Sequence, residues 1–168
     1  MRMRAVVAVL CALALTGCVP PGPSGPPEPD NRPDLKRADL IGAWKDSRRG
    51  GILVFTPAGF SGDDLAYMFA PFPHDLPDGF DPDRDRAAGS GVWKLGPSIA
   101  DPDGPNDYVR LNFDTIAGRP VAASINKLEA QREGTAIVLV FYVSDPDLND
   151  TIVYHRCPDC AAPTPTPS

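Results

Sequence analysis

The most constraining feature of the sequence is a series of short apolar segments separated by turns that are rich in Gly and Pro. Residues 108–114 alternate strictly, with Val109, Leu111 and Phe113 on one side and polar side chains on the other, which is typical of a half-buried strand. Residues 136–143 are apolar throughout and rich in β-branched and aromatic types, which predicts a central strand. Further strand patterns occupy residues 40–45, 51–55, 91–95, 120–129 and 151–155.

Helical patterns are confined to two short stretches between these strands. The first is residues 34–39, with Asp34 as the N-cap, and the second is residues 62–69, capped by Ser61. We therefore expect an all-β domain, an antiparallel meander that closes into a small barrel, with a β-sandwich as the alternative. Closing the sheet would remove the free edges that invite aggregation.

The first residues read as a targeting segment that precedes the domain. A basic start that includes Arg2 and Arg4 is followed by the apolar residues 5–15. That run is too short for a membrane-spanning helix, which needs about 20 apolar residues, and it suits the apolar part of a signal peptide. The segment ends in Leu15-Thr16-Gly17-Cys18.

This ending resembles the lipobox of exported bacterial lipoproteins. The resemblance implies that residues 1–17 are a signal peptide, cut just before Cys18, and that Cys18 carries a diacylglyceryl group with acyl chains such as palmitate. Two acyl chains anchor a protein stably, so we expect attachment to the cell membrane on its extracytoplasmic face. The alternative is an ordinary secretory signal with an incidental cysteine.

Composition separates the remaining chain into a linker, one domain and a tail. Residues 18–34 and 161–168 are rich in Pro and are predicted to be disordered, the former as a linker and the latter as a tail open to glycosylation. Residues 35–160 are long enough for a single core. After cleavage, 14 basic side chains face 22 acidic ones, a formal charge of −8. That charge is poorly suited to nucleic acid or to anionic lipid head groups.

Residues 40–44, Leu-Ile-Gly-Ala-Trp, resemble the Gly-x-Trp opening of the lipocalin-like, or calycin, barrels. In that family a short helix precedes the first strand, and the Trp plugs one end of the barrel. Small exported lipoproteins of mostly unknown function resemble this chain further, through a hairpin at residues 54–60, a second Gly-x-Trp at Gly91 and Trp93, and a closing Tyr154-His155-Arg156. If the sheet closes, the inward side chains either fill the barrel or line a ligand cavity. The candidates for such a lining are Trp44, Trp93, Val109, Leu111, Phe113, Ile137, Leu139 and Phe141.

Cys157 and Cys160 form a Cys-x-x-Cys pair beside His155. Structural zinc needs four ligands, and only the distant His74 is left as a fourth. A redox pair usually lies at a helix N-terminus, whereas this one follows the last strand. We expect a local disulfide that pins the end of the domain, as an oxidising compartment permits.

Other candidate sites are weak. Alternating acids at residues 81–85, 101–103 and 145–149 lack the Gly and Glu positions of a calcium loop, and Asp-Pro is ordinary turn chemistry. Residues 59–63, Gly-Phe-Ser-Gly-Asp, fall one position short of a nucleophile elbow. We therefore predict no metal, no cofactor and no catalytic residue.

The sequence thus predicts a non-enzymatic, lipid-anchored binding module of the cell envelope that takes a small hydrophobic ligand. The alternative is a module with a filled barrel that contacts an envelope protein or serves an envelope-structural role. The acidic loops and the long Pro-rich spacer favour that alternative, whereas the Gly-x-Trp opening and the apolar strand at 136–143 favour the ligand carrier.

Overall fold

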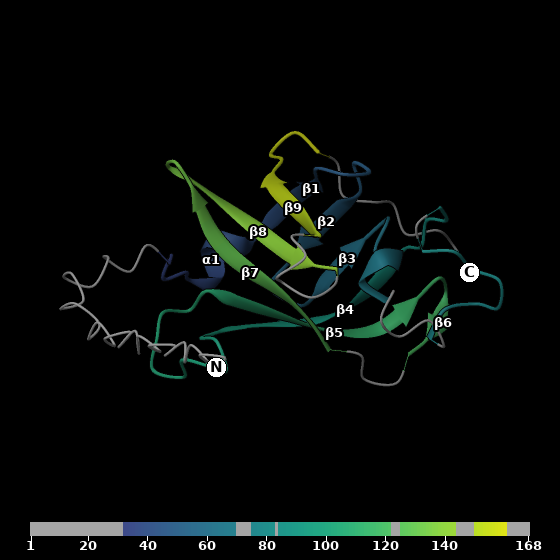
Figure 1. Ribbon diagram of the computed structural model, residues 1–168, viewed down its shortest axis with the longest axis horizontal. Coiled ribbons are helices and arrows are strands. Elements are labelled where there is room, and N and C mark those ends of the chain that lie inside the picture. Colours follow the sequence, from purple (N-terminus) through teal and green to yellow (C-terminus); the bar gives the residue numbers. More distant parts are fainter. Residues whose placement is uncertain (1–31, 70–74, 83, 122–124, 144–149, 161–168) are drawn as a thin grey trace, which may run out of the picture. The chain divides into compact units, whose positions relative to one another are not determined.

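The computed structural model describes residues 32–69, 75–82, 84–121, 125–143 and 150–160 (Figure 1). The predicted signal peptide, Cys18, most of the linker and the tail 161–168 lie outside the described residues. The elements are α1 (Arg37–Leu40), β1 (Gly42–Asp46), β2 (Ile52–Phe55), β3 (Phe60–Gly62), the 3₁₀ turn η1 (Ala66–Phe69), β4 (Gly89–Gly96), β5 (Tyr108–Ile116), β6 (Arg119–Pro120), β7 (Ile125–Glu133), β8 (Ala136–Tyr142) and β9 (Thr151–Arg156).

Within the described part of the chain, eight strands form one closed antiparallel barrel. Strands β1 to β5 each pair with the next, β5 pairs with β7, and β7, β8 and β9 continue the meander. Strand β9 then pairs with β1, which closes the sheet, while the short β6 adds only to β5. The predicted small antiparallel barrel is confirmed, and the β-sandwich alternative is wrong because a single sheet returns to its first strand.

The strands with the clearest patterns form as the sequence predicts. In β5 the inward Val109, Leu111 and Phe113 are buried, and the residues between them are at least partly exposed. Strand β8 lies between β7 and β9, as expected for a central strand. Strand β7 runs from Ile125 to Glu133, beyond the weak pattern seen at residues 120–129.

Both helix predictions need correction. Residues 60–62 form β3, so Ser61 pairs with Val54 and Ser90 instead of capping a helix, and only η1 follows. The first helix begins three residues later than predicted. Its N-cap is Lys36, whose backbone N–H donates to Asp39 Oδ2 at 2.7 Å, whereas Asp34 accepts from the backbone N–H of Asn106 at 3.0 Å. Neither of these helices, nor any other among the described residues, is long and apolar enough to cross a membrane.

The two ends of the barrel are closed by different means. One end, here called the helix end, carries α1, the turn at residues 56–59 and residues 157–160. The other, called the plug end, carries the turn at residues 47–51 and the long connection 63–88 between β3 and β4. Residues 65–69 of that connection are all buried, and we call them the plug.

Candidate functional site

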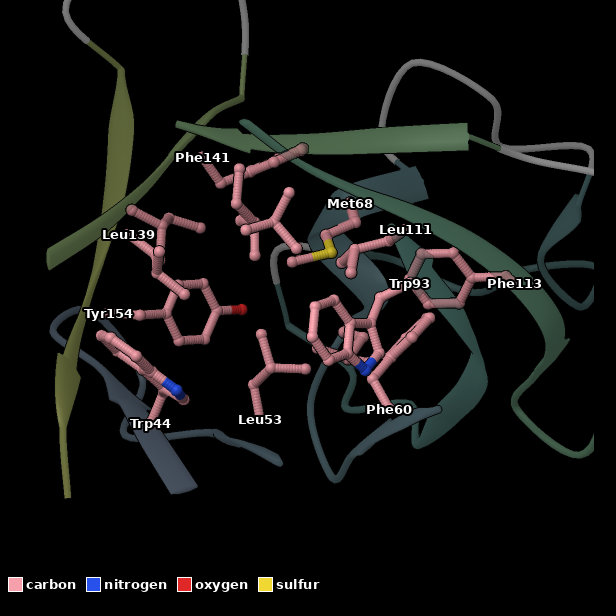
Figure 2. Close-up of a cluster of buried hydrophobic side chains, with 14 of the residues drawn as sticks. Trp44, Leu53, Phe60, Met68, Trp93, Leu111, Phe113, Leu139, Phe141 and Tyr154 are labelled. Carbon is pink, nitrogen blue, oxygen red and sulfur yellow. The ribbon is translucent and has the colours of Figure 1, made fainter. Parts of the chain in front are cut away.

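The barrel interior holds the side chains that the sequence predicts as a ligand lining. Seven of the eight, all but Ile137, are buried in one cluster at 5% exposure or less, and Ile137 is partly buried against that cluster. Figure 2 shows how these side chains converge from opposite walls. With the plug in place they pack against one another, so the described interior is a filled core.

Trp44 closes the helix end beneath α1. Its indole N–H donates to the carbonyl of Leu40 at 2.9 Å, and the guanidinium carbon of Arg156 lies 4.5 Å from the ring centroid. Arg156, at the end of β9, also donates to the backbone carbonyls of Asp39 and Ile41. Burial lowers the pKa of Arg156, the cost of desolvating a cation beside the ring. This arrangement ties β9, β1 and α1 into a fixed lid.

Trp93 is held in a similar way on β4. Its indole N–H donates to the carbonyl of Thr56 at 2.8 Å, and the guanidinium carbon of Arg37 lies 4.1 Å from the ring centroid. Phe55 meets the Trp93 ring edge-on, with centroids 5.4 Å apart. Both tryptophans therefore have their polar atom satisfied by backbone, which leaves their rings as apolar wall.

The plug closes the other end by inserting side chains between opposite walls. Phe69 packs edge-on against the inward Phe113 of β5, with centroids 4.8 Å apart, and Tyr67 lies 5.9 Å from Phe141 of β8. Met68 reaches toward Leu111 in the middle of the barrel (Figure 2). The plug is a loop segment, so it is not part of the barrel's hydrogen-bonded ladder.

Asp64, directly before the plug, is fully buried and faces two arginines. Its Oδ2 lies 2.9 Å from Nε of Arg49 and 3.6 Å from Nε of Arg86. Arg49 also donates to the carbonyls of Pro82 and Asp85, both at 2.7 Å, so it joins the β1–β2 turn to the loop that follows the plug. Burial raises the pKa of the Asp64 carboxyl despite these two cations. We call this ion-pair set, Asp64 with Arg49 and Arg86, the latch.

Asp46 lies beside the latch at the inner end of β1. Its carboxylate accepts from four backbone N–H groups of the following turn: Arg48 at 2.8 Å, Arg49 at 2.6 Å, Gly50 at 3.2 Å and Gly51 at 2.6 Å. A side chain at Gly51 would collide with both Asp46 and Asp64, since an added Cβ would lie 2.7 Å and 2.8 Å from their atoms. The carboxylate oxygens of Asp46 are thus occupied by hydrogen bonds from the turn that follows β1.

Several other buried polar atoms accept or donate no hydrogen bond to any described residue. They include Tyr67 Oη, Tyr154 Oη, Asn126 Nδ2 and Asp64 Oδ1, and also Asn112 Oδ1 and Asp107 Oδ1. Burial first, then the Asp46 and Asp64 carboxylates, raises the pKa of the Tyr67 phenol far above its usual value. In Figure 2 the Tyr154 hydroxyl points into the barrel, away from β9.

Two hollows lie on the outer surface at the helix end. One, of about 480 Å³, is lined by Ile41, Ala43, Val54, Arg156 and Cys160, among others. The second, of about 540 Å³, lies between α1 and the start of β8 and includes Trp44, Arg132, Ile137 and Arg156. Arg156 lines both hollows.

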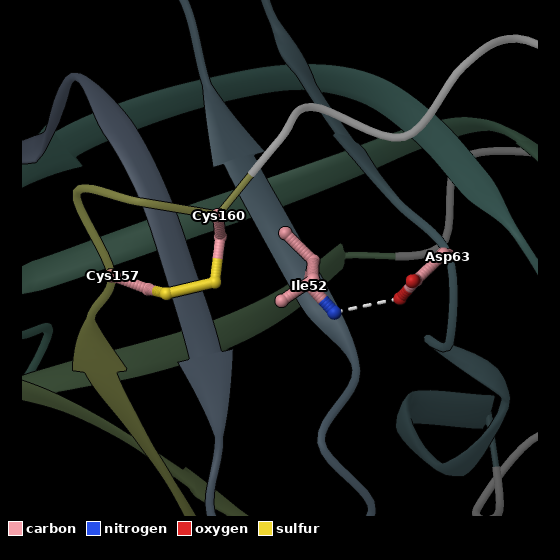
Figure 3. Close-up of a disulfide and its surroundings, with 4 residues drawn as sticks. All are labelled: Ile52, Asp63, Cys157 and Cys160. Atoms are coloured by element: carbon pink, nitrogen blue, oxygen red, sulfur yellow. Dashed lines mark hydrogen bonds between the residues drawn. A yellow bond between two sulfur atoms is a disulfide. The ribbon is translucent and has the colours of Figure 1, made fainter.

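The remaining sequence candidates have structural roles where they are described. Cys157 and Cys160 form a disulfide beside β1 and β2 (Figure 3), and the backbone N–H of Cys157 donates to Ala43 at 2.9 Å. The backbone N–H groups of Asp85 and Gly104 donate to the carbonyls of Asp81 and Asp101, as in turns. Residues 145–149 lie outside the described part. The described residues contain no cluster of three or more His, Cys, Asp or Glu able to hold a metal.

Sequence reasoning missed the polar residues of the plug end. Asp46, Asp64, Tyr67 and Asn126 are distributed over 81 positions of sequence, and each alone reads as a turn or surface residue. The available signal was positional: Asp46 and Asn126 occupy inward places on strands whose inward neighbours are apolar. Comparison of the chain with family models, with curated proteins and with solved structures finds no match.

Proposed function

We propose that this chain is a lipid-anchored module on the extracytoplasmic face of the cell membrane and that its barrel binds a small hydrophobic ligand. The lipobox resemblance at Cys18 supports the anchor, and the Pro-rich linker would hold the domain away from the bilayer. An eight-stranded barrel is wide enough to hold one small ligand once its interior is vacated.

The observation that carries the proposal is the unequal closure of the two barrel ends. The helix end is closed by Trp44 and Arg156, which belong to paired strands. The plug end is closed by residues 65–69, which the latch and a backbone hydrogen bond from Leu65 to Ala87 at 2.8 Å hold in place. Outward movement of this loop would open a route to the apolar interior without breaking any pairing between barrel strands, and its return would bring Tyr67 back against the ligand.

The ligand is tested by native mass spectrometry of the chain carrying Cys18→Ala, purified from a bacterial host without detergent. We expect a mass excess that disappears on denaturation. The refolded, ligand-free chain should then regain a mass excess when incubated with amphiphiles. A bare-chain mass in both experiments would contradict the proposal.

The anchor is tested separately by membrane fractionation and lipid labelling. Cys18→Ala should release the chain from the membrane and abolish labelling. Cys11→Ala is the matched control, because Cys11 lies in the predicted signal peptide and should not affect either readout. Retention of Cys18→Ala in the membrane fraction would count against lipidation at this residue.

The filled interior favours a second candidate, a module that contacts an envelope protein. Its contact surface would be the two hollows at the helix end, the second of which includes Pro33 and Asp34 at the end of the predicted linker. A bare-chain mass together with co-purification of a partner lost on Val54→Arg, a substitution within the first hollow, would select this alternative.

A further inference from the structure

Four of the buried polar atoms without partners belong to the plug, to the residue directly before it, or to strands β7 and β9, whereas Asp107 Oδ1 and Asn112 Oδ1 lie outside this set. Tyr67 and Tyr154 are 3% and 0% exposed, and neither hydroxyl has a partner among the described residues. Nδ2 of Asn126, near the start of β7, and Oδ1 of Asp64 likewise have no hydrogen-bond partner among the described residues. A buried polar group without a partner is costly, so such groups usually meet water or a ligand.

These groups are close to one another in the fold. Asp46 pairs with Tyr154 across β1 and β9, and both side chains point inward. Atoms of Asp46 and Asp64 lie 2.7 Å and 2.8 Å from the position that a Cβ on Gly51 would occupy. Tyr67 follows Asp64 by three residues, and its ring centroid lies 5.9 Å from that of Phe141. The interior therefore has an apolar half at the helix end and a half at the plug end that offers two hydroxyls, an amide N–H and a carboxylate oxygen.

We propose that the ligand is an uncharged amphiphile with a hydroxyl-bearing head group, bound with its head among Tyr67, Tyr154 and Asp64 and its apolar chain toward Trp44 and Leu139. This inference rests on the proposed function, since it names the class of ligand that the barrel takes. A hydroxyl fits because it can donate to Asp64 Oδ1 and accept from a tyrosine at the same time.

Charge argues against a fatty acid. The side chains of Asp46 and Asp64 are both buried at this end, and a third negative charge beside them would be repelled at short range. The nearest cation, Arg49, is occupied by Asp64 and by the carbonyls of Pro82 and Asp85. Arg86 lies farther from Asp64 and donates to the carbonyl of Arg49 at 2.6 Å. Neither arginine is free to neutralise a ligand carboxylate.

The test compares decanol with decanoate, which share a chain and differ in head-group charge at pH 7. Binding to the chain carrying Cys18→Ala is measured by calorimetry and by the fluorescence of Trp44 and Trp93. We expect decanol to bind at least about tenfold more tightly, because decanoate must bring its charge beside two carboxylates. Asp64→Asn should reduce the ratio of the decanol affinity to the decanoate affinity.

Two conservative variants locate the head group. Tyr154→Phe and Tyr67→Phe each keep the ring and remove a hydroxyl, and each should weaken decanol binding about threefold to tenfold while leaving the unfolding midpoint unchanged or higher. Tyr108→Phe is the matched control, because its hydroxyl donates to Glu129 on the outer face at 2.9 Å and should not affect binding.

The possible failures are distinguishable. If neither amphiphile binds, the proposed function falls and this inference falls with it. If decanoate binds as tightly as decanol, the barrel is a carrier but the neutral head group is wrong. If both Tyr→Phe variants bind decanol as the unsubstituted barrel does, the orphan hydroxyls meet water alone and the placement of the head group is overturned.

Discussion

At the scale of single residues, Asp64 is a carboxyl whose ionisation the folded protein opposes. Burial raises its pKa above the ordinary 3.8, and Arg49 and Arg86 offset that effect only in part. The folded chain therefore holds this proton more tightly than the unfolded chain does. The contribution of Asp64 to stability is greatest at low pH and is lost as pH rises from about 3.8 through the raised pKa.

Asp64→Asn removes this titration and keeps the side chain's shape. We expect the stability of the variant relative to the wild type, measured as the difference in free energy of unfolding in urea, to increase between pH 4 and pH 7. Asp103→Asn is the control, since Asp103 is exposed. Parallel pH dependence of Asp64→Asn and the wild type would show that the burial of Asp64 does not govern its ionisation.

The residues of the plug end also mark the limit of sequence reasoning. Strand patterns identified five buried members of the apolar lining, because an inward place on a strand needs only local pattern: Val109, Leu111, Phe113, Leu139 and Phe141. Trp44 and Trp93 were predicted from the resemblance to the Gly-x-Trp opening. The polar members come from a turn, a loop and separate strands, and only the closed barrel brings Asp46, Asp64 and Tyr67 together. No spacing of residues along the chain predicts that these side chains lie close together.

At the scale of elements, the two Gly-x-Trp segments use glycine for close approach. Gly42 has φ +122, and a Cβ there would lie 2.8 Å from the Arg156 guanidinium that covers Trp44. Gly91 lies at a β-bulge between β4 and β5, where a Cβ would lie 2.1 Å from the carbonyl oxygen of Asn112. In each motif, a large inward tryptophan ring therefore lies two residues after a glycine whose surroundings leave no room for a side chain.

Gly91→Ala should therefore lower the free energy of unfolding by about 1–3 kcal/mol, because the backbone of β5 cannot move away without breaking the ladder. Gly96→Ala, in the same strand, is the control, since its added Cβ would come no closer than 3.8 Å to the flexible end of Arg110. Chemical unfolding of both variants measures the difference. An equal loss in the two would contradict the close-approach explanation.

Arg156 shows what holds the helix end together. Lysine cannot reproduce a planar fork that spans the carbonyls of Asp39 and Ile41 while lying over Trp44. Arg156→Lys should cost about 1–3 kcal/mol of unfolding free energy. Arg84→Lys should change it by less than about 0.5 kcal/mol, because Arg84 is largely exposed and its ion pair is with a partly exposed Asp81. A similar loss in both variants would remove Arg156 from this role.

The elements that the sequence failed to predict are short or locally ambiguous. Strand β3 has only Phe60, Ser61 and Gly62, too few residues to display alternation, and its pairing to both β2 and β4 is what makes it a strand. The predicted cap, Asp34, does not cap the first helix because it is drawn to Asn106 in the β4–β5 loop, and Lys36 is the N-cap. Tertiary contacts, which a local sequence pattern does not contain, determine both the formation of β3 and the position of the helix N-cap.

At the scale of the whole molecule, the barrel and the plug should differ in stability although both are buried. Strand β5 pairs with β4 on one side and β7 on the other, so its amides open only when the barrel opens. The plug is held by side-chain packing, the latch and a few backbone bonds, including Leu65 to Ala87 and Met68 to Leu65. Proteins open in cooperative units of unequal free energy, and loops of this kind usually belong to the weaker ones.

Native-state hydrogen exchange tests this division. We expect the amides of Leu65 and Met68 to exchange through an opening that depends weakly on denaturant, and the amides of Val109 and Leu111 to exchange only with global unfolding. Arg49→Met, which removes the main cation of the latch, should speed amide exchange in the plug. The free energy of exchange in β5 should still equal the variant's own free energy of global unfolding. Bound ligand should change exchange at the plug more than at β5. If Leu65 and Met68 exchanged only with global unfolding, the plug would be an inseparable part of the core, and a ligand could not reach the interior by the route proposed.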